Sequence, residues 1–198
     1  MILFTFTLSN LELIGKEPAQ QEVETSEKIV TRSASETATF IVKLLSTKDW
    51  KEISKFVHPT RGVRFSPYAY VFTNRGVVLS QERIVEFANS DKKVIWGEYE
   101  GRGNPIELSM NGYYRRFLYR YDYKNVKHGP INTRVGQSSS VNRILKAYPE
   151  DNIAYFDFYF KDPLDQKSAD NWGSLRVVLQ EENKQWFLIS FVNDQWGP

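Results

Sequence analysis

The feature that most constrains the fold is a pair of apolar runs near the end of the chain, within residues 171–196. In the first run Leu175, Val177 and Leu179 alternate with other side chains, and a second run follows the polar segment 181–184. Two alternating runs joined by a short polar segment predict a β-hairpin. The second run is apolar on nearly both faces, so we expect it to lie inside a sheet that helices cover on one side.

The composition is that of an ordinary globular domain. The chain has 198 residues, of which 41% are hydrophobic and 25% charged, and both values fit a single core. Aromatic residues make up 15%, which favours a sheet-rich core. The formal net charge is only +2, so nucleic acid is not an expected partner. Because the chain has no cysteine, disulfides, thiolate metal sites and cysteine nucleophiles are excluded.

The first 35 residues differ in character from the rest. Residues 1–15 begin as an apolar run, but Asn10 and Glu12 interrupt it and it is too short to span a bilayer. We interpret it as a degenerate signal-like segment, as a segment that packs on the domain, or as an artefact of the chosen start site. Residues 16–35 are polar and are expected to form a tether. A single domain should then cover residues 36–198.

Within that domain the hydrophobic spacing predicts both helices and strands. Helices are expected from a cap at Ser35 or Thr37, from about Asp49 or Trp50 to Val57, after Ser80, and over 109–121, where a strand is the weaker alternative. Strands are expected over 62–71, where Pro67 implies an edge or a bulge, over 92–99 before a turn at 100–105, and over 153–160. Residues 125–140 are predicted to form a long loop, and a short segment with apolar residues follows from Val141. This order predicts an α+β fold in which a curved, mainly antiparallel sheet wraps the N-terminal helices.

The order of elements over about residues 35–198 resembles the cystatin-like cone fold of the superfamily named after nuclear transport factor two. Short phrases of the sequence narrow the resemblance to a family of uncharacterised bacterial lipoproteins: His58-Pro59, Gly62 to Tyr68, Trp96-Gly97 with Gly101 and Pro105-Ile106, Tyr113-Tyr114 and Phe117, Trp172, Leu175-Arg176, and Asp194-Gln195-Trp196. The resemblance implies a domain hung from a lipidated cysteine by a polar tether, in the bacterial cell envelope or secreted. Lys16 stands where that cysteine would be, so a membrane tether is expected only if the chain is lipidated.

The cone fold also implies a pocket between the concave sheet and the helices, in which some superfamily members perform acid–base chemistry. Asp157 is a candidate base if Tyr155, Asp157 and Tyr159 face that pocket. If Phe156, Phe158 and Phe160 face the pocket instead, Asp157 is a solvated or paired surface acid. We favour this second orientation because carboxylates are seldom buried. His58 is the second candidate, although a histidine at a helix end more often has a structural role.

Arginines interleaved with aromatic residues suggest a site for a carboxylate, a phosphate or a sugar. Arg64 and Arg176 each interrupt an otherwise apolar strand, and a buried arginine needs a partner. The alternative is that each arginine pairs with an aspartate such as Asp157 or Asp194 across the strands. The ligand-binding candidates are Arg64, Tyr68, Trp96, Tyr113, Arg116 and Arg176.

Three functions are consistent with these patterns. The first is a non-catalytic extracytoplasmic domain that binds a small ligand or an envelope protein. The second is an isomerase, dehydratase or hydrolase that uses Asp157 or His58 as a base and a tyrosine as an acid. The third is a structural homodimer packed sheet to sheet. Only two histidines are present, far apart and without a dense acidic cluster, so neither a metal nor another cofactor is expected.

Overall fold

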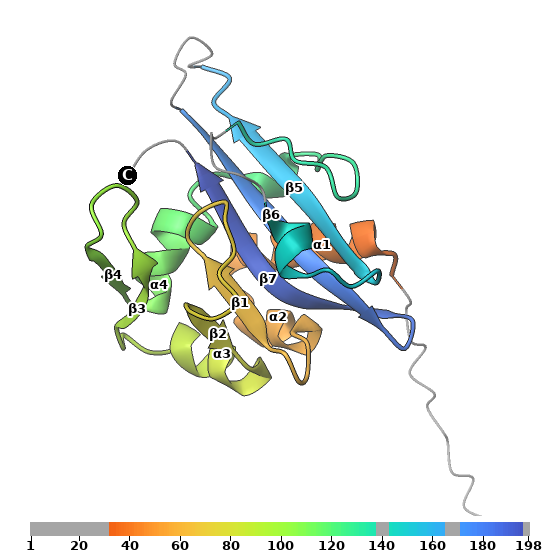
Figure 1. Ribbon diagram of the computed structural model, residues 1–198, viewed down its shortest axis with the longest axis horizontal. Coiled ribbons are helices and arrows are strands. Elements are labelled where there is room, and N and C mark those ends of the chain that lie inside the picture. Colours follow the sequence, from red (N-terminus) through yellow and green to blue (C-terminus); the bar gives the residue numbers. More distant parts are fainter. Residues whose placement is uncertain (1–31, 138–142, 165–170, 196–198) are drawn as a thin grey trace, which may run out of the picture. The chain divides into compact units, whose positions relative to one another are not determined.

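The computed structural model describes residues 32–137, 143–164 and 171–195. The segment 1–15 and most of the tether predicted over 16–35 lie outside these residues. Figure 1 shows the described elements, which are α1 (Ala34–Thr47), α2 (Trp50–Phe56), β1 (Val63–Ser66), β2 (Val77–Leu79), α3 (Gln81–Ala88), β3 (Val94–Glu98), β4 (Pro105–Leu108), α4 (Met110–Tyr113), the π-helical turn η1 (Tyr114–Leu118), the 3-10 turn η2 (Tyr123–Asn125), α5 (Ile144–Ala147), β5 (Ile153–Lys161), β6 (Trp172–Glu182) and β7 (Gln185–Gln195). The predicted α+β class is confirmed.

The predicted C-terminal hairpin forms the centre of the main sheet. Strands β6 and β7 are antiparallel, and Asn183 and Lys184 turn the chain with φ values of 51° and 63°, as a type I′ turn requires. The sheet has the order β2-β1-β7-β6-β5, so β7 lies inside it, as predicted. The sheet is mainly antiparallel, as predicted, and the exception is strand β1, which runs parallel to β7. Parallel strands need a long connection, and here most of the domain lies between the two strands in sequence.

The helices cover one face of this sheet. Figure 1 shows α1 and α2 behind the long strands. On that face Phe156, Val177 and Phe191 pack into the main core with Ile41 and Ile53 of the two helices, and all five side chains are buried. The alternation of β5 is therefore confirmed, with its phenylalanines directed toward the helices.

The helix starts are fixed by side-chain caps. Ser80 caps α3 and Ser109 caps α4, as the sequence predicts. The first helix begins earlier than predicted, because Ser33 and Glu36 form a capping box in which each side chain accepts the other residue's backbone N–H. The prediction of Ser35 or Thr37 as the cap is wrong for this reason.

Two further differences concern the short strands. The strand expected over 62–71 ends at Ser66, and it lies between β2 and β7 rather than at an edge. Pro67 has no N–H to continue the ladder, so the chain leaves the sheet there. Strands β2 and β4, of three and four residues, were not predicted from the sequence, because runs this short carry little periodicity.

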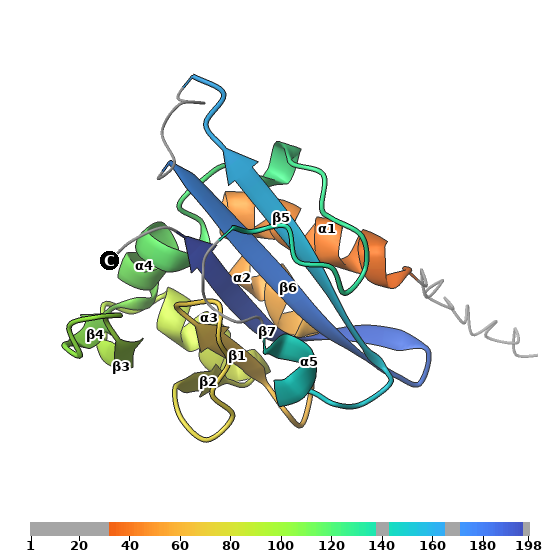
Figure 2. The same cartoon turned by 45° about the horizontal axis from the view of Figure 1, so that its top comes forward.

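The opposite face of the sheet is covered by the segment 126–137 and by α5. Figure 2 shows this teal-green segment crossing in front of β5 and β6. Its backbone bonds the free edge of β5, where the N–H groups of Gly129 and Asn132 donate to the carbonyls of Asp157 and Tyr155. Ile144 of α5 is fully buried in a second apolar cluster on this face. The part of this predicted loop that the structure describes, up to residue 137, therefore packs on the domain, and its hydrogen bonds to β5 cover an exposed sheet edge.

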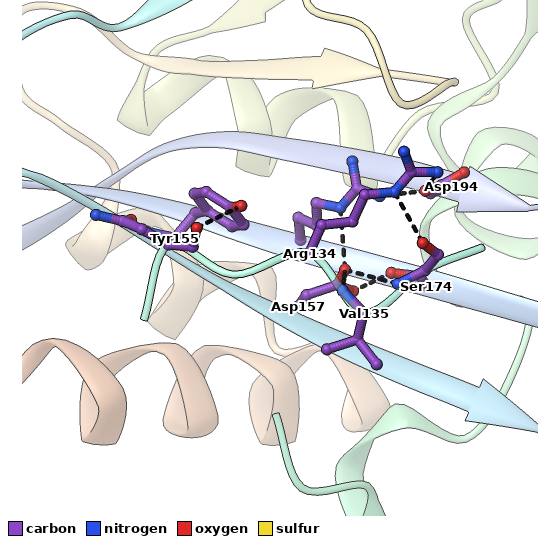
Figure 3. A network of polar contacts seen from close by, with 9 residues as sticks. Arg134, Val135, Tyr155, Asp157, Ser174 and Asp194 are labelled. Carbon is purple, nitrogen blue, oxygen red and sulfur yellow. Dashed lines mark hydrogen bonds and ion pairs between the residues drawn. The ribbon is translucent and has the colours of Figure 1, made fainter. Parts of the chain in front are cut away.

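A buried network of charges joins this segment to the sheet (Figure 3). Arg176 is fully buried between Asp157, its cross-strand neighbour on β5, and Asp194 on β7. Its Nε donates to Asp157 Oδ2 over 3.2 Å, and its Nη2 donates to Asp194 Oδ2. The prediction that Asp157 lies at the surface is therefore wrong, because the segment 126–137 covers its side chain. The predicted pairing of Arg176 with aspartates is confirmed.

The segment 134–136 completes this network, which we call the charge clasp: Arg134, Asp157, Ser174, Arg176 and Asp194. The N–H groups of Val135 and Gly136 donate to Asp157 Oδ2 over 2.7 Å and 3.0 Å. Ser174 donates to the other oxygen of the same carboxylate, and Arg134 Nη2 lies 3.4 Å from Asp194 Oδ2. A Cβ on Gly136 would lie 2.8 Å from Asp194 Oδ2, so the close approach requires a glycine. Two positive and two negative side chains thus balance in a buried site.

His58 has a structural role at the end of α2. Its ring is 4% exposed, and its Nδ1 accepts the backbone N–H groups of Thr60 and Arg61 over 3.3 Å and 3.2 Å. Its Nε2 lies 3.5 Å from Glu182 Oε2. Burial lowers the pKa of His58, and the Glu182 carboxylate offsets this lowering only in part. The neutral ring, with Nδ1 as acceptor, therefore fits the turn that leads into β1.

Replacing Asp157 tests the contribution of the clasp to stability. The change Asp157→Asn keeps the shape but leaves Arg176 short of one countercharge, so we expect a loss of about 3 kcal/mol in the free energy of unfolding. Chemical denaturation measures it, with Asp151→Asn at an exposed turn as the matched control. In the double variant with Arg176→Met the loss should be smaller than the sum of the two single losses. An Asp157→Asn variant as stable as the control would contradict the clasp.

His58 predicts a decline of stability in mild acid. Because its pKa is lower in the folded than in the unfolded chain, the unfolded chain binds the proton first as the pH falls. The stability due to neutral His58 is complete above its ordinary value of 6.5 and declines as the pH falls below it. Denaturation series across this range should show less decline in His58→Asn, which keeps an acceptor, than in wild type or His128→Asn. Equal declines in all three proteins would refute this role.

Candidate functional site

An open cavity of about 400 Å³ lies between the segment that follows β1 and the β3–β4 hairpin. It is lined by residues from 65–76 on one side and from 95–103 on the other. Strand β1 ends at Ser66 because Pro67 leaves the ladder, and the chain then loops out before it returns as β2. On the facing side β3 and β4 pair around the turn 100–104, where the Tyr99 N–H donates to the Asn104 carbonyl over 2.8 Å. The cavity has the size of a small-molecule site.

Its floor is a stack of buried aromatic rings. Trp96 is 1% exposed, and its indole N–H donates to the Leu108 carbonyl over 2.8 Å. Tyr113 lies parallel to this indole with ring centroids 4.2 Å apart, and Phe65 meets it edge-on at 5.2 Å. Rings held from two sides in this way form a rigid apolar surface, which loses little entropy when a ligand contacts it.

Three aromatic residues of the segment after Pro67 form one wall. Tyr68 stacks on Tyr70 with centroids 6.0 Å apart, and Phe72 meets Tyr70 edge-on at 4.9 Å. Tyr68 is buried and its Oη accepts the Glu100 N–H over 3.2 Å, which links this wall to the facing turn. Burial raises the pKa of Tyr68 and of Tyr70, and the Glu100 carboxylate also acts to raise both. For Tyr68 the hydrogen bond from the Glu100 N–H offsets part of this rise in pKa. Both phenols therefore stay protonated at neutral pH.

Charged groups border the mouth of the cavity. Glu98 and Glu100 are exposed and line it from the β3 side. Arg75 faces them, with its guanidinium 3.9 Å from the Phe72 ring centroid and its Nη1 3.9 Å from Glu98 Oε2. Arg64 holds this loop in place, because its guanidinium donates to the carbonyls of Arg75 and Thr73 over 2.6 Å and 3.0 Å.

The structure brings together some of the predicted ligand-binding residues and separates others. Tyr68 and Trp96 line the cavity, and Tyr113 supports it from below. Arg64 shapes its loop, and Arg116 packs its guanidinium 5.1 Å from the ring centroid of Tyr99, a lining residue.

The remaining candidates do not line the cavity. Arg176 and Asp157 belong to the charge clasp, and His58 belongs to the turn after α2. The acid–base hypothesis therefore loses the two residues on which it was based. The position of the cavity also differs from the expectation, because the space between the sheet and the helices is filled by the packed core.

Several lining residues were not singled out from the sequence: Tyr70, Phe72, Arg75, Glu98, Tyr99 and Glu100. One signal was available, since Tyr68, Tyr70 and Phe72 recur at every second position directly after Pro67. The prediction of a turn at 100–105 is confirmed. The role of this turn as a wall of the cavity depends on the β3–β4 pairing, which was not predicted.

Within residues 32–137, 143–164 and 171–195, no helix has the length and apolar character needed to cross a bilayer.

No protein-family model matches the chain, and no curated protein is significantly similar to it in sequence. Among solved structures, one described as a calcium/calmodulin dependent protein kinase II association domain from Xanthomonas campestris is 16% identical, with a TM-score of 0.33 over 83% of this chain and 89% of that one. A DUF4783 family protein from Bacteroides ovatus is 7% identical, with a TM-score of 0.29 over 85% of this chain and 98% of that one. Likenesses at this level carry no argument about function.

Proposed function

We propose that the chain is a non-catalytic binding domain whose aromatic cavity takes a small organic molecule. The observation that carries this proposal is the cavity of about 400 Å³, floored by Trp96 and walled by Tyr68 and Tyr70. Binding sites for small molecules are concave, mostly apolar and largely pre-formed, with a few polar groups that orient the ligand. The supporting rings are buried and packed on one another, so the floor exists before a ligand arrives.

The polar groups of the cavity suit binding better than proton transfer. Tyr68 and Tyr70 both have a raised pKa, so they can donate hydrogen bonds but are poor bases at neutral pH. The carboxylates of Glu98 and Glu100 are exposed at the mouth rather than held in an apolar site. General acid–base catalysis favours a group whose pKa is tuned by burial, close to a reacting atom.

The proposal includes the location and the family relationship that the sequence suggests. An extracytoplasmic domain, related to the envelope lipoproteins and to the cone-fold superfamily, would meet small molecules outside the cytoplasm. The lack of cysteine suits an oxidising compartment. Fractionation of cells that express the full chain, with detection in the envelope and the medium, tests this location directly.

An NMR screen tests the binding function. We expect compounds from a panel of small organic molecules to shift the Trp96 indole N–H and the amides of Gly97 and Gly101, which border the cavity. Tyr70→Ala removes one aromatic wall and should weaken such binding about tenfold. Ile131→Ala, at an exposed apolar residue elsewhere, is the matched control and should leave affinity unchanged. Shifts confined to other parts of the molecule, or equal affinities in the two variants, would refute the proposal.

A further inference from the structure

We propose that the cavity selects an organic cation, specifically a quaternary ammonium group carried by a small molecule. This inference rests on the proposed function and assigns a ligand class to the same site. It follows from three features of the cavity: the aromatic faces, the carboxylates at its mouth, and the position of one arginine of the chain itself.

The first feature is the density of aromatic rings. The ring of an aromatic residue carries partial negative charge on its faces, so it attracts a cation that lies within about 6 Å of its centroid. Tyr68, Tyr70 and Phe72 on one side and Trp96 and Tyr99 on the other all line the cavity. Trp96 and Tyr68 are only 1% and 3% exposed, so the ring surface open to a ligand comes mainly from Tyr70, Phe72 and Tyr99. Several rings that border one space suit a quaternary ammonium group.

The second feature is the negative charge at the mouth. Glu98 and Glu100 line the cavity, and the only ion pair that either makes within the described residues is the 3.9 Å contact of Glu98 with Arg75. Burial is the main cause that raises the pKa of Tyr70, the Glu100 and Glu98 carboxylates raise it further, and Arg75 lowers it. The lining thus carries two carboxylates against one guanidinium, a balance that favours a positive ligand.

The third feature is a cation that the chain already places at this wall. The Arg75 guanidinium lies 3.9 Å from the ring centroid of Phe72 and beside Glu98, with a side chain that is 56% exposed. Its position marks the wall as complementary to a cation, and it also makes Arg75 a competitor for a cationic ligand.

The hydrogen-bonding groups of the cavity favour a quaternary ammonium group over a primary one. A primary ammonium has three N–H donors that must all be satisfied when it leaves water. The Trp96 indole offers only a donor, which Leu108 accepts, and the Tyr68 Oη already accepts the Glu100 N–H. The buried rings therefore offer few acceptors to an ammonium group, and the carboxylates lie at the mouth. A quaternary ammonium such as that of choline has no N–H group and needs no such acceptors, and its methyl groups gain from contact with the rings.

A pair of probes that differ only in charge tests the inference. Choline and its neutral carbon analogue 3,3-dimethylbutan-1-ol have nearly the same shape, and NMR titration of the Trp96 indole N–H of the full chain measures both. We expect choline to bind at least about fivefold more tightly. If the neutral analogue binds as tightly, or if other panel compounds shift this resonance and choline does not, the cation inference is overturned while the binding function stands. If no compound shifts it, both proposals fall.

Charge variants give effects of opposite sign. Glu98→Gln should weaken choline binding about fivefold, whereas Arg75→Gln should strengthen it by removing the competing guanidinium. Glu107→Gln is the matched control, because Glu107 is exposed on the same hairpin and does not line the cavity. Amide spectra check that each variant is folded. If Arg75→Gln weakens binding and Glu98→Gln strengthens it, the site takes an anion and the inference is overturned.

Discussion

The ion pairs of Arg176 with Asp157 and Asp194 are the constraint on which the rest of the structure depends. All three side chains are at most 1% exposed, and a buried charge is tolerated only when partners surround it. Two of these partners are the backbone N–H groups of Val135 and Gly136, which donate to the Asp157 carboxylate. The segment 126–137 must therefore lie against the sheet, although it contains no long helix or strand of its own.

This constraint limits where the molecule can bind anything. The helix-facing side of the sheet is filled by the core, and the segment 126–137 and α5 cover much of the other side. A homodimer packed sheet to sheet, which stays a prediction, would find that part of the sheet already occupied. The loop after Pro67 and the β3–β4 hairpin lie outside these covered faces, and their aromatic residues meet at a cavity rather than at a filled interface.

The sequence predicted what depends on strong local patterns. The hairpin, the alternation of β5 and the caps at Ser80 and Ser109 all follow from spacing and cap chemistry. The buried state of Asp157 could not be predicted, because it depends on the segment 126–137, which has no periodicity of its own. The cavity could not be predicted for a related reason: its two walls are separated in sequence, and the pairing that aligns them depends on β4, a run too short to recognise.

The central claim about the molecule is that the clasp, rather than the sheet alone, holds the segment 126–137 in place. Hydrogen exchange of the Val135 and Gly136 amides tests this claim most directly, since both donate to Asp157 in a buried site. We predict that in wild type they exchange almost as slowly as the amides of β6. In Asp157→Asn they should exchange much faster, while the amides of the β3–β4 hairpin keep their rates. Val135 and Gly136 amides that exchange in wild type as fast as those of an unfolded peptide would contradict the account.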